Sequence, residues 1–206
     1  MLVIVLAVYG SPPRAGGPAA RLNVLDSGAD VALERAAAIT VADAPPSPAA
    51  PVTASGPAGP PPPGRLLIPS IGVNAPVRAV GLDKDGAMGV TSTSYDVGWY
   101  SPGVAPGNPG DAVIDGHLDW YDTSRAVFYN LRQVHIGDDI EVQRLDGVTK
   151  HFRINSVTTV AYNASVPGLF ANSGAPRLTL ITCGGSWDRK LGQYTQRVIV
   201  DASLVA

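Results

Sequence analysis

Three side chains that together could carry out acyl transfer stand at or within strand-like segments of this chain. The only cysteine, Cys183, ends the β-branched run TLIT, and a Gly-Gly pair follows it. Arg197 lies 14 positions later in a second strand-like run, and His117 lies 66 positions earlier. A thiolate can attack a carbonyl, an imidazole can take up and return the proton, and a guanidinium can stabilise the resulting oxyanion. These residue types predict a cysteine acyl-transfer site.

Each of these residue types also has a plainer role. Most free cysteines are small buried hydrophobes, and we assign the other two histidines, His135 and His151, to structural or solvated positions. The flanking strand, the Gly-Gly turn and the two partners favour a catalytic role for Cys183. Arg189, in the segment that connects the two strand-like runs, is the alternative to Arg197, but placement within a strand favours Arg197.

The segments that contain the three residues resemble the active-site segments of the sortases, which are cysteine transpeptidases of the bacterial cell surface. The run TLITC at 179–183 with RVIV at 197–200 is similar to their active-site strand pair, and GDAVIDGH at 110–117 is similar to their histidine strand and loop. The continuations CGGSWD and HLD, the latter followed by AVF at 126–128, resemble the class F sortases of actinobacteria. The resemblance extends from residue 65 to the C-terminus and keeps the order histidine, cysteine, arginine.

The resemblance implies a mechanism without a cofactor. Cys183 would attack the threonine carbonyl in a Leu-Pro-x-Thr-Gly sorting signal of a surface protein, and His117 would protonate the departing glycine amine. Arg197 would stabilise the oxyanion or hold the signal, and an amine of peptidoglycan or of another protein would resolve the thioester. Two alternatives stay open, namely a thiol endopeptidase that uses water as the acceptor and a non-catalytic anchored β-domain.

Residues next to the three candidates are predicted to contact the substrate. Thr182 could place its hydroxyl or backbone near the substrate carbonyl, and Trp187 could line an apolar groove for a peptide. Asp119 follows His117 closely enough to orient or polarise the ring, or to serve a turn. We expect Trp99, in contrast, to pack in the core or at its rim.

The pattern of the domain is that of an all-β protein. The strand-like runs cover residues 65–68, 73–82, 112–115, 139–144, 150–162, 177–182 and 194–201. Glycine and proline interrupt nearly every gap, and strands and helices do not alternate, which predicts a closed or partly closed antiparallel barrel. The sortase resemblance implies eight strands. Short helices are expected at 124–131 and, for a single turn, at 166–170.

The first 63 residues differ in composition from the rest. Residues 1–9 are uninterruptedly apolar, but a bilayer span needs about 20 residues. We interpret them as the end of a truncated membrane anchor, with a degenerate signal or a merely adhesive terminus as alternatives. Residues 10–63, rich in proline, alanine, glycine and serine, predict a disordered tether, and residues 64–206 the catalytic domain. Because sortases usually carry an N-terminal anchor, the resemblance implies a cell-membrane location with the domain on the extracellular side.

Charge and cysteine content exclude several functions. The net charge is −2, so no basic surface for nucleic acid is expected. A single cysteine excludes an intrachain disulfide and any cysteine-rich zinc site, and the three histidines lack the spacing of metal ligands.

Overall fold

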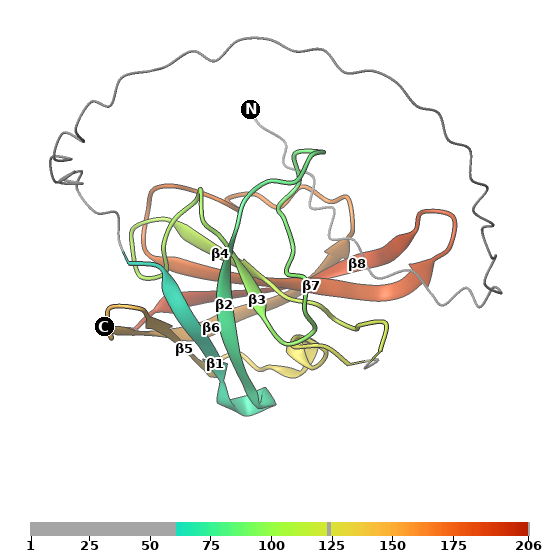
Figure 1. Cartoon of the computed structure of the whole chain (residues 1–206). Helices are drawn as coiled ribbons and strands as arrows, with labels where there is room; N and C mark the ends of the chain where they lie inside the picture. The colour runs from blue at the N-terminus through green and yellow to red at the C-terminus, as the bar shows by residue number, and fades with distance from the viewer. Residues whose placement is uncertain (1–60, 123–124, 206) are drawn as a thin grey trace, which may run out of the picture. The chain divides into compact units, whose positions relative to one another are not determined.

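A computed structural model of the chain describes residues 61–122 and 125–205 (Figure 1). The predicted anchor at 1–9 and all but the last three residues of the predicted tether at 10–63 lie outside these residues, so both stay predictions. In the described part of the chain, no helical segment combines the length and the hydropathy that crossing a membrane requires.

Eight strands close into a barrel, as the resemblance implied. The strands are β1 (Pro63–Ile68), β2 (Val73–Val80), β3 (Val97–Tyr100), β4 (Asp111–Asp115), β5 (Asp139–Arg144), β6 (Thr149–Ala161), β7 (Arg177–Asp188) and β8 (Gln193–Leu204). Around the barrel they follow the order β1-β2-β3-β4-β7-β8-β6-β5, and β5 pairs with β1 to close it. The longest strands, β6, β7 and β8, form one continuous side of the barrel (Figure 1).

The expectation of an antiparallel barrel does not hold at two junctions. β2 pairs with β3 in parallel, and β4 pairs with β7 in parallel. Parallel neighbours require a long crossover rather than a hairpin, and the chain supplies one at residues 81–96 and another that includes β5 and β6. The second crossover sets β4 directly beside β7, although 61 residues separate the end of one from the start of the other.

The local predictions fail where the alternation of polar and apolar residues fails. β3 was not predicted, because its residues are all buried and one of them is a glycine, so no alternation marks it. β7 extends beyond the predicted 177–182 because the Gly-Gly pair continues the strand instead of ending it, and β8 extends beyond the predicted 194–201 at both ends.

Neither predicted helix is present in the described residues. Of the segment expected at 124–131, residues 125–130 consist mainly of turns, and the last residue begins a 3-10 helix, η2 (Leu131–Gln133); residue 124 lies outside the described residues. The segment at 166–170 is a turn in which the Leu169 amide donates to the Val166 carbonyl. A second 3-10 helix, η1 (Pro69–Ile71), joins β1 to β2.

Buried apolar residues form two separate clusters on the two faces of the barrel wall. The larger cluster fills the barrel and includes Leu178 and Leu180 of β7, and Trp99 packs in it as expected. Side chains alternate along a strand, so Ile181 and Cys183 point to the opposite, outer face. There they belong to the second cluster, together with Met88, Tyr100 and Val113.

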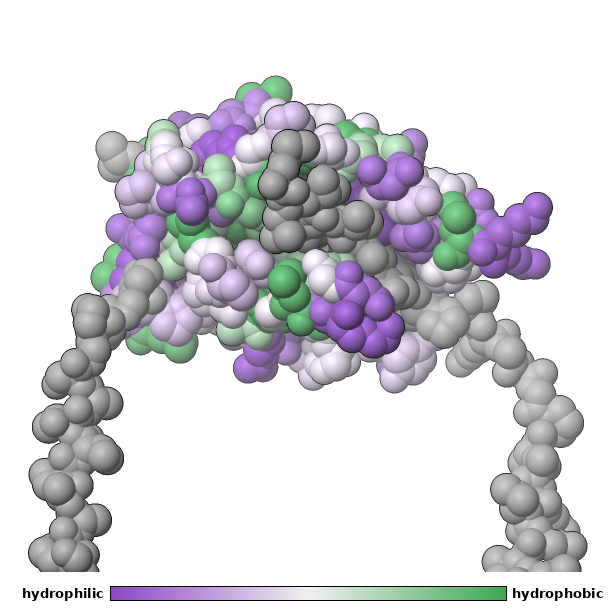
Figure 2. Space-filling model, turned by 90° about the horizontal axis from the view of Figure 1, so that it is seen from above, coloured by the Kyte–Doolittle hydropathy of each residue, from purple (hydrophilic) through white to green (hydrophobic). Residues whose placement is uncertain are grey.

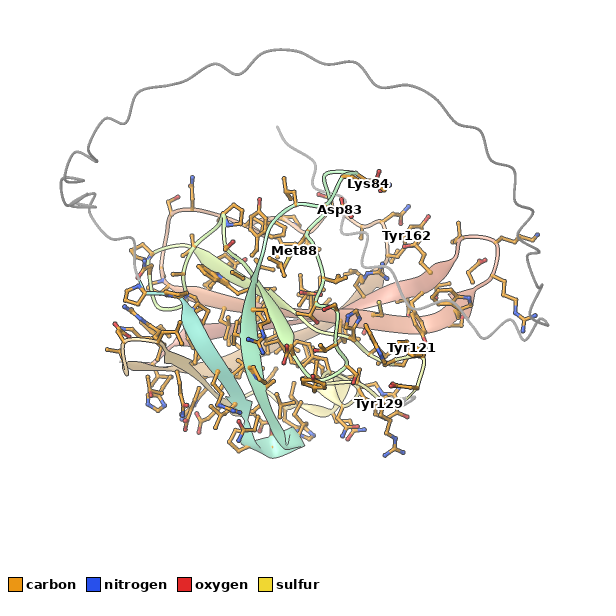
Figure 3. All side chains as sticks on the ribbon, viewed as in Figure 1. Asp83, Lys84, Met88, Tyr121, Tyr129 and Tyr162 are labelled. Carbon is orange, nitrogen blue, oxygen red and sulfur yellow. The ribbon has the colours of Figure 1, made fainter. Side chains whose placement is uncertain are left out.

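The loop between β2 and β3 covers this outer cluster. Its tip is a turn in which Asp83 accepts hydrogen bonds from two backbone amides, while Met88 points back toward the barrel and is 1% exposed (Figure 3). Outside the grey atoms, the face shown in Figure 2 mixes hydrophilic and hydrophobic residues without a large apolar patch. Cys183 and Met88 are only 3% and 1% exposed, so the apolar surface beside the cysteine is enclosed.

Candidate active site

The register of three neighbouring strands brings the predicted residues together. Cys183 on β7 is paired directly across from Arg197 on β8. One residue, Gly116, separates His117 from the end of β4. Gly116 is hydrogen-bonded to β7 through both its amide and its carbonyl. Its amide donates to the Ile181 carbonyl at 3.0 Å, and its carbonyl accepts from the Thr182 hydroxyl at 2.7 Å. The histidine loop is thus attached to the two residues that precede the cysteine.

Cys183 lies in an apolar, enclosed environment. The residue is 3% exposed and contacts the outer cluster that contains Met88 and Ile181. Burial raises the pKa of the Cys183 thiol to about 11, and the charge of Arg197 opposes this rise. The thiol is therefore neutral at physiological pH in the resting state.

His117 is held by a backbone carbonyl of the β2–β3 loop. Its Nε2 lies 2.8 Å from the Thr91 oxygen, and because a carbonyl only accepts, Nε2 carries a hydrogen and Nδ1 is the nitrogen that can exchange a proton. The Trp120 ring packs against the imidazole edge-on, with 4.6 Å between centroids. Burial lowers the pKa of His117, whereas the Thr91 bond and the charge of Asp119 act in the opposite direction.

Arg197 is 1% exposed, and its guanidinium supports the start of β8. Nη1 donates to the carbonyls of Gln196 and Tyr194 at 2.8 and 3.1 Å, and Nη2 donates to Gln193 Oε1 at 3.2 Å. Burial lowers the pKa of Arg197, and the neighbouring Cys183 opposes that decrease. The alternative, Arg189, is exposed in the turn between β7 and β8, so the register places only Arg197 across from the cysteine.

Asp119 and Trp187, both predicted to contact substrate, are joined through Tyr194. The Tyr194 hydroxyl donates a hydrogen bond to Asp119 Oδ2, and the Trp187 ring packs edge-on against the Tyr194 ring at 5.4 Å. Burial and the Asp119 carboxylate raise the pKa of Tyr194. Tyr194 therefore connects the β7–β8 hairpin to the histidine loop.

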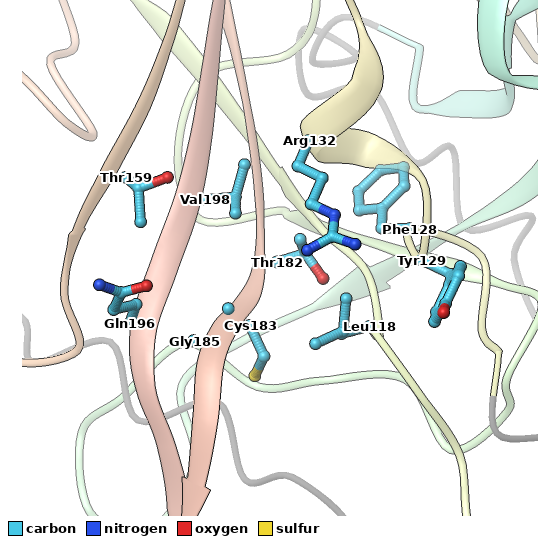
Figure 4. Close-up of a pocket in the computed structure, with 11 residues that line it drawn as sticks. Leu118, Phe128, Tyr129, Arg132, Thr159, Thr182, Cys183, Gly185, Gln196 and Val198 are labelled. Atoms are coloured by element: carbon cyan, nitrogen blue, oxygen red, sulfur yellow. The ribbon is translucent and has the colours of Figure 1, made fainter.

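A pocket of about 150 Å³ opens beside Cys183 (Figure 4). Its wall consists of Leu118, Phe128, Tyr129, Arg132, Thr159, Thr182, Cys183, Gly184, Gly185, Gln196 and Val198. Thr182, the third predicted substrate contact, lies in this wall. The Arg132 guanidinium extends toward Thr182 in the pocket (Figure 4). The cysteine, although buried, can thus be reached from this pocket.

The described residues outside the site form no group of potential metal ligands. His135 and His151 are exposed, as expected of solvated residues. Among residues 61–122 and 125–205, no group of three histidine, cysteine, aspartate or glutamate side chains could hold a metal ion.

Sequence reasoning missed several residues of the site. Thr91 acts through its carbonyl, which every residue type offers, so no sequence signal could have found it. Tyr194 and Arg132 are ordinary surface types, and only the fold reveals their neighbours. Met88 carried a weak signal, because an isolated methionine in a long loop is often buried.

Both the sequence and the structure of this chain are similar to those of known proteins. The sortase domain family model matches residues 66–205. Sortase C-1 from Actinomyces oris is similar in structure, with a TM-score of 0.55, 27% identity and coverage of 69% of this chain and 73% of that chain. A lid mutant of sortase A from Corynebacterium diphtheriae has a TM-score of 0.55, 22% identity and coverage of 69% of each chain, and so bears on the fold alone. No curated protein matches the sequence.

Proposed function

We propose, on the premise that this chain belongs to the sortase family of cysteine transpeptidases, that it cleaves an LPXTG-type sorting signal after threonine and transfers the protein to an amine of the cell wall. The observation that carries the proposal is the register of β4, β7 and β8. This register pairs Cys183 with Arg197. Hydrogen bonds also join Gly116, the residue before His117, to Ile181 and Thr182, the two residues before the cysteine.

The first step forms a thioester. Cys183 gives its proton to His117 as its sulfur attacks the threonine carbonyl, and His117 then protonates the departing glycine amine. Because burial raises the pKa of the thiol and lowers the pKa of the imidazole, the resting pair is neutral, and proton transfer accompanies attack. The Thr91 contact at Nε2 supports Nδ1 as the nitrogen that exchanges the proton.

Arg197 provides a fixed positive charge beside the sulfur. Its bonds to the start of β8 hold the guanidinium in place, so it costs little reorganisation when negative charge develops on the substrate oxygen. We propose that it stabilises this oxyanion or holds the sorting signal. We propose that Asp119 contacts the signal from the histidine loop, Trp187 from the β7–β8 hairpin, and Thr182 from β7 next to the cysteine.

The subclass and the location are part of the same proposal. The runs CGGSWD and HLD support assignment to class F, and the apolar residues 1–9 support an N-terminal membrane anchor with the domain on the extracellular side. The partners would be surface proteins with a C-terminal sorting signal. Protease treatment of intact cells that produce the full chain should degrade the domain, and full protection would contradict the location.

The experiment follows cleavage of an LPXTG peptide with and without an added amine. Replacement of Cys183 by alanine should lower turnover by about a thousandfold or more, because the nucleophile is lost. His151→Ala serves as the matched control at an exposed histidine and should keep full activity. Undiminished turnover in the cysteine variant would end the proposal, and release of the free acid alone in the presence of amine would favour the thiol endopeptidase.

A further inference from the structure

The pocket beside Cys183 contains a single charged side chain, Arg132. No carboxylate lies in the pocket wall. Within the described ranges, no hydrogen bond or ion pair joins Arg132 to another residue. Several other arginines of the barrel contact carboxylates, for example Arg144 with Asp146 and Arg153 with Asp139, both at 2.8 Å. Arg132 thus presents an uncompensated guanidinium toward the space next to the nucleophile (Figure 4).

The two sides of β7 at Cys183 differ in chemistry. On the outer face the cysteine contacts enclosed apolar side chains such as Met88 and Ile181, which offer no polar group. The pocket wall instead combines apolar side chains such as Phe128 with the polar groups of Arg132 and Gln196. A polar, negatively charged ligand fits the pocket better than the apolar part of a signal does.

We infer that this pocket receives the amine acceptor and that Arg132 binds a carboxylate carried by that acceptor. The inference rests on the proposed function, because it concerns the second substrate of the same reaction. A volume of about 150 Å³ is smaller than the roughly 300 Å³ at which complete small-molecule sites begin, so the pocket holds one end of a larger acceptor.

The chemistry of the second step agrees with this placement. The amine nitrogen must be neutral to attack the thioester carbonyl, and a nearby guanidinium disfavours the protonated amine while it attracts a carboxylate. The C–N bond forms, the C–S bond breaks and its electron pair goes to sulfur. The proton released by the amine passes through His117 to the sulfur, which restores the thiol of Cys183.

The test compares two acceptors that differ only in charge. Nα-acetyl-lysine and Nα-acetyl-lysine amide carry the same ε-amine, and transfer of an LPXTG peptide to each is measured by mass spectrometry with the full chain. The unsubstituted chain should favour the carboxylate in kcat/KM about tenfold, which corresponds to about 1.4 kcal/mol. Arg132→Gln should abolish the preference. Arg132→Lys should keep part of it, because lysine retains the charge but not the planar fork.

The matched control is Arg153→Gln, which removes an exposed arginine of β6 and should keep the tenfold preference. Because the readout is a ratio within one variant, a change in stability or in thioester formation does not affect it. Equal transfer to both acceptors in the unsubstituted chain, a preference that survives in Arg132→Gln, or hydrolysis alone would overturn the inference. An uncleaved peptide would instead overturn the proposed function, and with it the inference.

Discussion

The buried state of Cys183 leads to a prediction about its titration. A rise in the pKa of the thiol from 9.0 to about 11 leaves one hundredth as much thiolate at neutral pH as an unperturbed cysteine would have. The main cause is burial, and Met88 is one of the side chains that enclose the sulfur. Met88→Ala should admit water and move the pKa of Cys183 back toward 9.0.

The assay is alkylation of Cys183 by iodoacetamide across pH 6 to 12, followed by mass spectrometry. In the unsubstituted chain the rate should rise about tenfold per pH unit without reaching a plateau below about pH 10, since only the thiolate reacts. In Met88→Ala the midpoint of the profile should fall by about one pH unit, as expected when part of the desolvation is relieved. The midpoint, rather than the rate, is compared, because easier access also speeds the reaction.

A core variant away from the cysteine separates this effect from general loosening. Ile140 is fully buried in the barrel, and Ile140→Ala should cost about 2–5 kcal/mol of stability, as Met88→Ala should, yet leave the midpoint unchanged. A plateau below pH 8 in the unsubstituted chain would show that the thiol is ionised at rest. An equal midpoint in the two variants would refute the role assigned to Met88.

Three shorter predictions concern the neighbours of the cysteine. Tyr194→Phe removes the bond to Asp119 and should lower the free energy of unfolding in urea by about 1 kcal/mol, with lower kcat; equal stability would contradict the link between hairpin and loop. Thr182→Val leaves the buried Gly116 carbonyl without this donor and should cost about 1–2 kcal/mol in the same assay, whereas an unchanged transition would show that the bond is dispensable. Because burial lowers the pKa of His117, the acid limb of kcat/KM should have its midpoint below pH 6.5, and a midpoint above 6.5 would mean that Asp119 outweighs burial.

Much of the site could be predicted because its residues lie within regular strands or directly after one. The β-branched run before Cys183 and the apolar run before His117 do form adjacent strands, and Arg197 does lie across from the cysteine. These segments obey local rules of alternation and propensity. The sortase resemblance supplied the barrel itself, since seven strand-like runs do not specify how a sheet closes.

The remainder depends on contacts that no local pattern encodes. The parallel pairing of β4 with β7 is fixed only when the barrel closes, and the fully buried β3 shows no alternation. The bond of Tyr194 to Asp119 spans 75 positions, and the Thr91 carbonyl that holds His117 is a backbone group. These features could be recognised only after the three-dimensional arrangement was known.

The junction of β4 with β7 also bears on the order in which the protein folds. The β7–β8 hairpin needs only a short turn, whereas residues 111–115 reach 177–181 after the chain between them has been arranged. Because contacts distant in sequence close slowly, we expect the hairpin to form early and catalysis to appear last during refolding. The fluorescence of Trp187 should then recover before enzymatic turnover. Regained activity would therefore measure the fraction of molecules in which the barrel has closed completely.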